Sequence, residues 1–393
     1  MRILVSDYSG HPFQVQLSRS LALRGHTVLH VASASFQTPK GRLDATDQDS
    51  PNFSTVNLKN KRPFAKSGLV RRYFQEIEMG KLIGKQIADF RPDIVISSNA
   101  PLDTQRIIQL ATRKTGAKFV FWIQDVYSEA IHSILSRRLG LVGAFVGAHY
   151  RRLEARLLRR AHHVVAIAPE FVPLITALAG IEPDKVTVIP NWAPLGEIGT
   201  FERDNEWVRE NLPDTRFRAV YSGTLGFKHD PDLLYLLATQ IDGDVVVFSE
   251  GEAADQLKQR AKENGVTNLL VRGWLPFEEL PKALAGADVL IVVLEPDAGA
   301  FSVPSKVLTY LCVGRPILGS ILPQNLAAQI ITEAEAGETF APGDRKSFIA
   351  AATSLAENPA RIAQMGTNAR AYAETAFDIE KITERFEQVI TIL

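Results

Sequence analysis

A lysine and two serines stand at the start of an apolar helical pattern late in the chain. The segment FSVPSKVLTYLCVGRP spans residues 301–316, and we expect its helix to begin near Pro304, because proline is favoured in a first turn. Ser302 and Ser305 are candidate caps. A lysine in the first turn opposes the helix dipole, so Lys306 is locally unfavourable unless an anion compensates it. The pattern favours a phosphate ligand; the simpler interpretation is that Lys306 extends into solvent.

A second combination of glycines and a lysine opens the second half of the chain. In YSGTLGFKHDPDLL, residues 221–234, an apolar run is followed by Gly223, Gly226 and Lys228 before a helix expected near Pro231. Glycines allow the backbone to approach a ligand closely, and a helix start offers free amides to a pyrophosphate. The spacing differs from G-x-x-x-x-G-K-[ST], which argues against a nucleoside triphosphatase.

Polar and aromatic residues follow two further apolar runs. Glu250 and Gly251 come after one of them, and Trp274 comes after the next. Ligands of open parallel sheets bind beyond the carboxyl ends of strands. A carboxylate or an aromatic ring there suits a ribose or a base, although Trp274 taken by itself is more typical of a packing residue.

The first apolar run ends in SDYSGHPFQ, residues 6–14. Gly10 permits a tight turn, and the amides of the helix start that follows attract an anion. His11 either donates to a phosphate or sugar hydroxyl or only caps the helix. The loop lacks G-x-G-x-x-G, so the dinucleotide fingerprint is absent.

Near-continuous apolar runs alternate with helical patterns along the chain, which is typical of parallel strands buried on both faces and covered by helices. The alternation restarts after a polar, Gly- and Pro-containing stretch at 191–207. We therefore predict an α/β protein with two Rossmann-like, doubly wound parallel-sheet domains. Residues 33–66, broken by four Gly and Pro, are expected to be a long excursion of the first domain, and 359–393 a helical tail.

Composition and charge narrow the functional classes. The 393 residues are 46% hydrophobic with zero formal net charge, which argues against a nucleic-acid binder. Residues 1–195 carry 26 Lys and Arg against 15 Asp and Glu, and the rest carry 18 against 29. A single cysteine, Cys312, fits a reducing cytoplasm and a core position. We expect no signal peptide and no membrane-spanning segment.

These motifs, taken in order, resemble those of a known family. YSGTLGFK, SEGE, VRGWLPFEELPKALAGADVLIVVL and FSVPSKVLTYLCVGRPIL are similar to segments of retaining glycosyltransferases of the GT-B fold, most of all the bacterial group-one (family four) enzymes of surface-polysaccharide assembly. The resemblance implies two facing domains: 1–195, with a C-terminal helix 377–393 packed back on it, for the acceptor, and 196–376 for a nucleoside-diphosphate sugar. No metal or other cofactor is implied, since basic groups and helix amides would neutralise the leaving diphosphate.

The resemblance also implies roles for individual residues. The diphosphate would meet Lys306, the basic clamp Lys228 and, from the first domain, Gly10, while Trp274 would lie by the base. The family often has two glutamates around the late loop, and here their positions hold Phe301 and Thr309; Thr224 replaces a common arginine of the clamp. The donor-site residues implied or favoured are Gly10, Gly223, Lys228, Glu250, Gly251, Trp274, Ser302, Val303, Pro304, Ser305, Lys306 and Thr309.

Two carboxylates in FWIQDVYSEA are the candidate catalytic residues. Related enzymes place a His or Asp facing the sugar at this strand end, so the resemblance implies that role for Asp125, with Glu129 second. Asp125 would orient the acceptor hydroxyl or stabilise positive charge at the anomeric carbon; the alternative is a cap of the following helix. His11 is the candidate contact to the acceptor or sugar.

Residues 135–163 combine apolar side chains with seven arginines. An apolar segment flanked by arginines is typical of an interfacial element on an anionic leaflet, and the alternative is a core helix with a basic solvated face. The first interpretation predicts a peripheral protein at the cytoplasmic face of the membrane.

The sequence thus predicts transfer of a hexosyl or N-acetylhexosaminyl group, with retention, from a UDP-sugar to a lipid-linked or oligosaccharide acceptor. The alternatives are a GT-B nucleotide-sugar epimerase and a non-catalytic nucleotide-sugar-binding scaffold. No nucleic-acid partner is expected.

Overall fold

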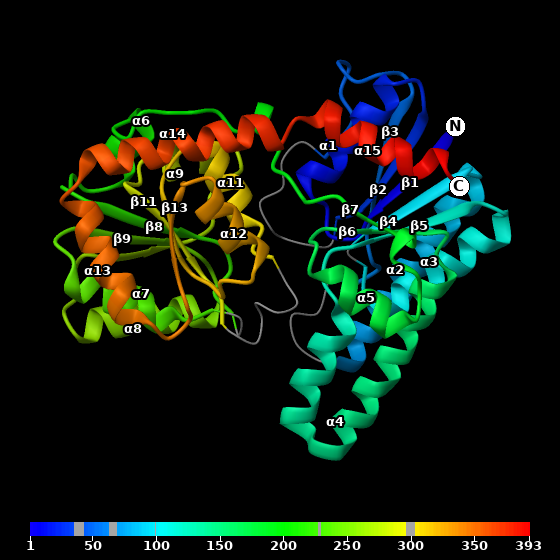
Figure 1. Ribbon diagram of the computed structural model, residues 1–393, viewed down its shortest axis with the longest axis horizontal. Helices are drawn as coiled ribbons and strands as arrows, with labels where there is room; N and C mark the ends of the chain where they lie inside the picture. The colour runs from blue at the N-terminus through cyan, green and yellow to red at the C-terminus, as the bar shows by residue number, and fades with distance from the viewer. Residues whose placement is uncertain (35–42, 63–68, 99, 227–228, 296–302) are drawn as a thin grey trace. The chain divides into compact units, whose positions relative to one another are not determined.

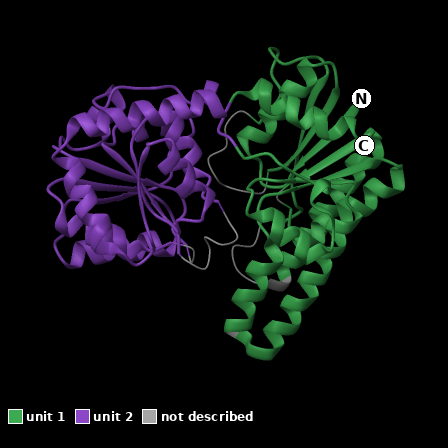
Figure 2. Cartoon of the chain, in the orientation of Figure 1, with its two compact units in different colours: residues 1–191, 378–393 green, residues 192–377 purple. Residues whose placement is uncertain are grey.

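The computed structural model describes residues 1–34, 43–62, 69–98, 100–226, 229–295 and 303–393. The chain forms two compact units, Met1–Asn191 together with Asp378–Leu393, and Trp192–Phe377 (Figure 2). The second unit is therefore contiguous in sequence, whereas the first is built from both ends of the chain. The division expected from the sequence, at residues 195 and 377, lies within a few residues of these bounds.

Unit 1 is built on a parallel sheet with the strand order β3-β2-β1-β4-β5-β6-β7 (Figure 1). The strands are β1 Arg2–Asp7, β2 Thr27–Ser33, β3 Phe53–Leu58, β4 Ile94–Ser98, β5 Lys118–Ile123, β6 His163–Ala166 and β7 Val186–Val188. Its helices are α1 Pro12–Leu23, α2 Leu69–Phe90, α3 Leu102–Thr115, α4 Tyr127–Arg160, α5 Phe171–Ala179 and α15 Ile379–Thr391, with a 3₁₀ turn, η1, at Pro183–Lys185.

Unit 2 repeats this plan with the order β10-β9-β8-β11-β12-β13, again parallel. Its strands are β8 Arg218–Ser222, β9 Asp244–Phe248, β10 Leu269–Arg272, β11 Val289–Val293, β12 Ile317–Ser320 and β13 Gly337–Phe340. Its helices are α6 Glu206–Asn211, α7 Pro231–Gln240, α8 Glu252–Glu263, α9 Leu280–Ala285, α11 Lys306–Val313, α12 Leu326–Glu333, α13 Arg345–Ala356 and α14 Pro359–Ala376, with a 3₁₀ turn, η2, at Leu195–Glu197.

The central strands of each unit are apolar throughout because helices cover both of their faces. All five residues of β11 are buried, and Ile3, Leu4 and Val5 of β1 have no exposed surface. Figure 1 shows α9, α11 and α14 on one face of the second sheet and α7, α8 and α13 on the other. The predicted class, two Rossmann-like parallel-sheet domains, is confirmed.

The excursion expected at 33–66 contains a strand that the sequence pattern did not indicate. β3 extends the first sheet and pairs in parallel with β2, with Val28 opposite Phe53. β13 at the edge of the second sheet was also not predicted. Both strands are only partly buried, so neither shows the continuous apolar run by which the other strands were recognised.

The last helix returns to unit 1 and completes its core. Phe386 of α15 packs edge-on against Trp122 of β5, with ring centroids 4.8 Å apart. The hydroxyl of Thr383 donates to Ser20 of α1 at 2.9 Å in a buried contact. Arg24 at the end of α1 forms an ion pair with Glu387 at 2.7 Å. The predicted return of the C-terminal helix is confirmed.

Helix α4 is a hairpin rather than one continuous rod. Gly140 has φ 56° and ψ −131°, outside the helical region, and joins two helical arms. Figure 1 shows the two arms side by side, with the turn at the end farthest from the sheet. The basic, apolar segment noted at 135–163 therefore spans the end of the first arm, the turn and the returning arm, and reaches the start of β6.

Candidate functional site

The ammonium group of Lys306 lies at the carboxyl edge of the second sheet. Its Nζ stands 3.6 Å from the centroid of the Tyr221 ring, at the end of β8. The Nζ is buried and has no hydrogen-bond partner in the described part of the chain. Lys306 does not extend into solvent, so that alternative is wrong. A buried ammonium without an anion is costly, which makes this position suited to a bound anion.

The turn after β8 is shaped to admit this side chain. Gly223 has φ 131°, and a Cβ there would lie 3.0 Å from the Lys306 Nζ, so a side chain at this position would displace the amine. Tyr310 of α11 fixes the same turn, because its hydroxyl accepts from the Ser222 amide at 2.9 Å. Gly223 and Lys306, predicted to share the donor site, are thus neighbours.

Burial sets the protonation of Lys306. Desolvation lowers the pKa of this amine from 10.5 to about 7, since a low-dielectric surrounding disfavours the charged form. A bound phosphate would favour the ammonium and raise the pKa again. The charge of this group is therefore coupled to anion binding.

Other candidate residues lie on the same edge of the second sheet. Glu250 follows β9, and its carboxylate accepts from the Trp274 amide at 3.3 Å. Gly251, with φ 107°, is the N-cap of α8. The structure thus brings Glu250 and Trp274 together, as their predicted contact with one nucleoside requires.

A cavity of about 410 Å³ opens at the carboxyl ends of β11 and β12. It is lined in part by Glu295, Ser320, Gly343 and Arg345, and Arg345 pairs with Asp230 at 2.8 Å. The sequence did not single out Arg345 or Asp230. Their pairing joins the N-termini of α13 and α7, so only the fold reveals it.

The remaining donor-site predictions are distributed around the start of α11. The helix begins at Lys306 with Ser305 at the N-cap, so Pro304 precedes the cap instead of lying in the first turn. The Ser305 side chain makes no capping bond. Val303 and Thr309 are partly buried here. Lys228 and Ser302, and with them the predicted second lysine and the Ser302 cap, lie outside the described residues.

In unit 1, the carboxylate of Asp7 fills the loop after β1. Asp7 is fully buried and accepts from the amides of Ser9 at 3.2 Å, Gly10 at 2.9 Å and His11. A carboxylate of the loop itself therefore occupies the amides that precede α1, and the expectation that amides of the helix start attract an external anion stays a prediction. Gly10, with φ 73°, serves to bend the loop around Asp7; its approach to a diphosphate stays a prediction.

Asp7 also orients His11. The Nδ1 of His11 lies 3.2 Å from the Asp7 carboxylate. Burial alone would raise the pKa of Asp7, but attraction to His11 and His30 and the bonds from His11 leave it lowered. An ionised carboxylate only accepts hydrogen bonds, so Nδ1 of His11 carries a proton that it donates to Asp7. The His11 side chain makes no capping bond to α1, so the capping alternative is wrong, and its contact to the sugar or acceptor stays a prediction.

The two candidate catalytic carboxylates have different surroundings. Val126 is the N-cap of α4, and the Ser128 amide in its first turn donates to the carboxylate of Glu154 at 3.0 Å, so Asp125 does not occupy the N-cap position that the alternative gave it. Asp125 is partly exposed at the end of β5. Glu129 instead forms an ion pair with Arg151 at 2.7 Å. Glu129 is thus engaged in an ion pair, and the catalytic role of Asp125 stays a prediction.

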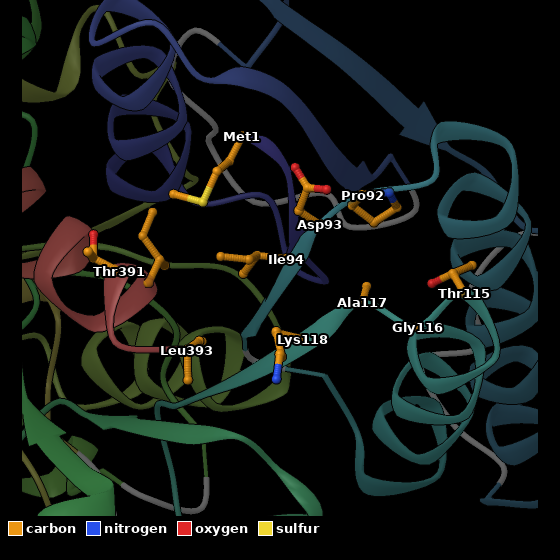
Figure 3. Close-up of a pocket in the computed structure, with 11 residues that line it drawn as sticks. Met1, Pro92, Asp93, Ile94, Thr115, Gly116, Ala117, Lys118, Thr391 and Leu393 are labelled. Carbon is orange, nitrogen blue, oxygen red and sulfur yellow. The ribbon is translucent and has the colours of Figure 1, made fainter.

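Another cavity lies in unit 1, at the amino edge of its sheet. Figure 3 shows the pocket of about 490 Å³ between the start of β1, the segment before β4 and α15, lined in part by Met1, Asp93, Lys118 and Thr391. It adjoins the amino ends of the strands and so lies away from the edge where Asp7 and Asp125 stand.

The carboxyl-edge sites can be compared with known proteins. Residues 11–192 match the model described as a glycosyl transferase 4-like domain, and residues 232–358 match that of glycosyl transferases group 1. The chain is 24% identical over 318 residues to WcaI of Escherichia coli K12, named as a glycosyl transferase of colanic acid biosynthesis, covering 76% of this chain and 73% of WcaI. It is 24% identical over 327 residues to WbjE of Pseudomonas aeruginosa, named as a glycosyltransferase, covering 81% and 78%.

Solved structures share the fold. Sucrose-phosphate synthase of Thermosynechococcus elongatus matches with a TM-score of 0.76 at 14% identity, covering 100% of this chain and 98% of the other. HepE of Anabaena, in complex with UDP and glucose, matches with a TM-score of 0.72 at 16% identity over 100% of both chains. The chain therefore belongs to the group 1 glycosyltransferases of the GT-B fold.

Proposed function

We propose that the protein transfers a hexosyl or N-acetylhexosaminyl group from a UDP-sugar to a hydroxyl of a lipid-linked or oligosaccharide acceptor, with retention at the anomeric carbon. In this proposal unit 2 binds the donor and unit 1 the acceptor. The solved structures of HepE from Anabaena, which contain UDP, UDP with glucose or UDP-glucose, support the choice of donor.

The observation that carries the proposal is the buried amine of Lys306, which has no hydrogen-bond partner among the described residues and lies beside the glycine turn after β8. A diphosphate placed there would supply the missing anion and compensate the desolvation of the amine. It would also stabilise the negative charge that develops on the leaving nucleotide, which is the task of a metal ion in other transferases. We propose on this ground that transfer needs no metal, which activity in the presence of EDTA would test.

In unit 1 we propose that His11 and Asp125 face the sugar and the acceptor. Asp7 orients the His11 ring through Nδ1, and in this proposal the ring contacts a hydroxyl of the sugar or the acceptor. Asp125 supplies a negative charge beside the positive charge that develops at the anomeric carbon. Glu129, already paired with Arg151, would hold the loop rather than react.

We further propose that the protein works at the cytoplasmic face of the membrane, where a lipid-linked acceptor is presented. None of the helices in the part of the chain that the structure describes has the length and apolar character needed to cross a bilayer. Association would therefore be peripheral and would involve the basic segment 135–163. Arg159 is less available for this, because it donates to the carbonyl of Ala179 at 3.0 Å.

Ligand-induced stabilisation tests the donor assignment. We expect UDP and UDP-sugars to raise the melting temperature, because a ligand at 100 times its Kd that binds only the folded state adds about 2.7 kcal/mol. AMP and inorganic phosphate at equal concentration are the controls. Stabilisation by none of the nucleoside diphosphates tested would contradict the proposed function.

The stereochemistry of the product tests the mechanism. Nuclear magnetic resonance of the product should show the new glycosidic bond in the anomeric configuration of the donor. An inverted product would reject retention but not transfer. Release of UDP together with an epimerised sugar, without acceptor, would identify an epimerase, and binding without turnover in the presence of lipid acceptor would identify a scaffold.

A further inference from the structure

The turn of the α4 hairpin carries a group of exposed apolar side chains, which we call the apolar tip. Leu141 is 83% exposed, Phe145 77% and Val142 66%. Leu139 and Val146 complete the tip, and both are also exposed. Side chains of this size rarely stay in water together without a partner surface.

The two arms of the hairpin are packed too closely to bury these side chains between them. Gly143 and Gly147, four residues apart and both buried, face the other arm. A Cβ at Gly143 would lie 1.9 Å from the carbonyl oxygen of Leu135, and a Cβ at Gly147 would lie 2.3 Å from Nδ1 of His132. Glycines at this spacing allow the close helix contacts that are common within membranes. The tip side chains must therefore point outward.

The charges around the tip are all positive. Residues 130–153 contain four arginines and two histidines but no aspartate or glutamate. Arg137 stands three residues before Gly140, and Arg152 stands twelve residues after it. At 1.5 Å per helical residue these positions lie about 5 Å and about 18 Å along the hairpin from its turn. A partner that binds the tip should thus have an apolar interior, which takes the tip, and an anionic surface, which contacts the arginines.

We propose that the apolar tip inserts into the interfacial layer of an anionic phospholipid bilayer, as the mode of the peripheral association proposed above. Interfacial elements bury their apolar face by about 5–10 Å, a depth that covers the tip. Arg137 and Arg152 then lie near the headgroups, and anionic lipid attracts them. A second copy of the chain is a poorer occupant, because two tips would bring like charges together.

Flotation with vesicles tests the insertion. The full-length protein should float with vesicles that contain phosphatidylglycerol and much less with phosphatidylcholine alone. Replacement of Leu141, Val142 and Phe145 together by serine should lower the vesicle partition coefficient at least about 100-fold. Each replacement removes a large apolar side chain that would otherwise be buried in the bilayer. The matched control is Leu23→Ser, because Leu23 is 72% exposed on α1, away from the hairpin.

A fluorescent probe separates insertion from surface attraction. Phe145→Trp should show blue-shifted emission and quenching by brominated phospholipids, whereas Leu23→Trp should show neither. The double change Arg137→Gln and Arg152→Gln should reduce binding to anionic vesicles. In the protein that still binds, Phe145→Trp should keep the blue-shifted emission and the quenching that Leu23→Trp lacks.

Three results would overturn the proposal: no flotation of the unmodified protein with anionic vesicles, equal flotation of the triple serine variant, or a dimer in sedimentation that the triple variant abolishes. Thermal stabilisation by UDP should be unchanged in the triple variant. Absence of flotation by the unmodified protein, with its UDP stabilisation intact, would thus reject tip insertion alone, and absence of UDP stabilisation with flotation intact would reject the proposed function alone.

Discussion

Replacement of Lys306 by methionine should weaken UDP binding by about 1.5–3 kcal/mol, the contribution of a hydrogen bond to a charged group. The same change should leave the melting temperature of the unliganded protein unchanged or raise it. The reason is that the amine is buried without a hydrogen-bond partner in the described residues, and methionine has a similar shape without the cost of burying a charge. Isothermal calorimetry and thermal unfolding measure the two effects.

UDP binding should also depend on pH through this amine. Its pKa is about 7 in the unliganded fold against an ordinary 10.5, and bound diphosphate should return it toward the ordinary value. Between these two pH values binding takes up a proton, so the Kd should rise about 50-fold from pH 7 to pH 9. Because the unfolded chain binds more protons in that window, the unliganded protein should gain stability as pH rises through it.

Lys306→Met is its own control for this dependence, since both pH effects should disappear in the variant. Calorimetry in buffers of different ionisation enthalpy would measure the proton uptake directly. An unchanged UDP affinity in Lys306→Met would show that this ammonium does not meet the phosphates.

Replacement of Asp7 by asparagine should destabilise unit 1 by about 3 kcal/mol and reduce sugar transfer more than 100-fold. The buried carboxylate accepts from three loop amides and from the His11 ring. An amide group offers one acceptor fewer and adds a donor without a partner. It also removes the charge that fixes the His11 tautomer, an effect known to be large in enzymes with a carboxylate–histidine pair. Thermal unfolding and a transfer assay measure the two consequences.

His11→Ala separates the two roles of Asp7, because it removes the ring and keeps the backbone amides. We expect it to retain stability and to lose transfer activity to a similar extent. Full activity in His11→Ala would mean that Asp7 only shapes the loop. The pKa of Asp7 is lowered from an ordinary 3.8, so its stabilising contribution should be complete above that value. It should disappear as the pH falls through the lower folded pKa, and the difference in stability between Asp7→Asn and the unmodified protein should shrink there.

Much of the fold could be predicted from the sequence because most parallel strands covered on both faces leave near-continuous apolar runs. β11, with the sequence VLIVV, is such a strand. β3 and β13 are edge strands with partly exposed side chains, and their sequences look like loops. What distinguishes them is their pairing with the preceding strand, with Val28 opposite Phe53 and Ile317 opposite Gly337, which no local pattern records.

The sites were predictable by position but not by their contacts. The locations of Gly223 and Lys306 follow from strand ends and glycines. The position of the Lys306 amine over the Tyr221 ring and its desolvation depend on how α11 packs on β8. The Asp7 carboxylate was missed because it ends a strand without any motif, and only the loop geometry turns three amides toward it. In α4, Gly143 and Gly147 were visible, but their role in joining two arms required the turn at Gly140.

The return of residues 378–393 to unit 1 has a consequence for how the chain matures. Domains usually complete folding in the order in which they leave the ribosome. Here the second unit is finished at Phe377, while the first still lacks Phe386, whose ring covers Trp122. Unit 1, although most of it is translated first, therefore cannot complete its core beside α1 and β5 until α15 has been translated, which happens after all of unit 2.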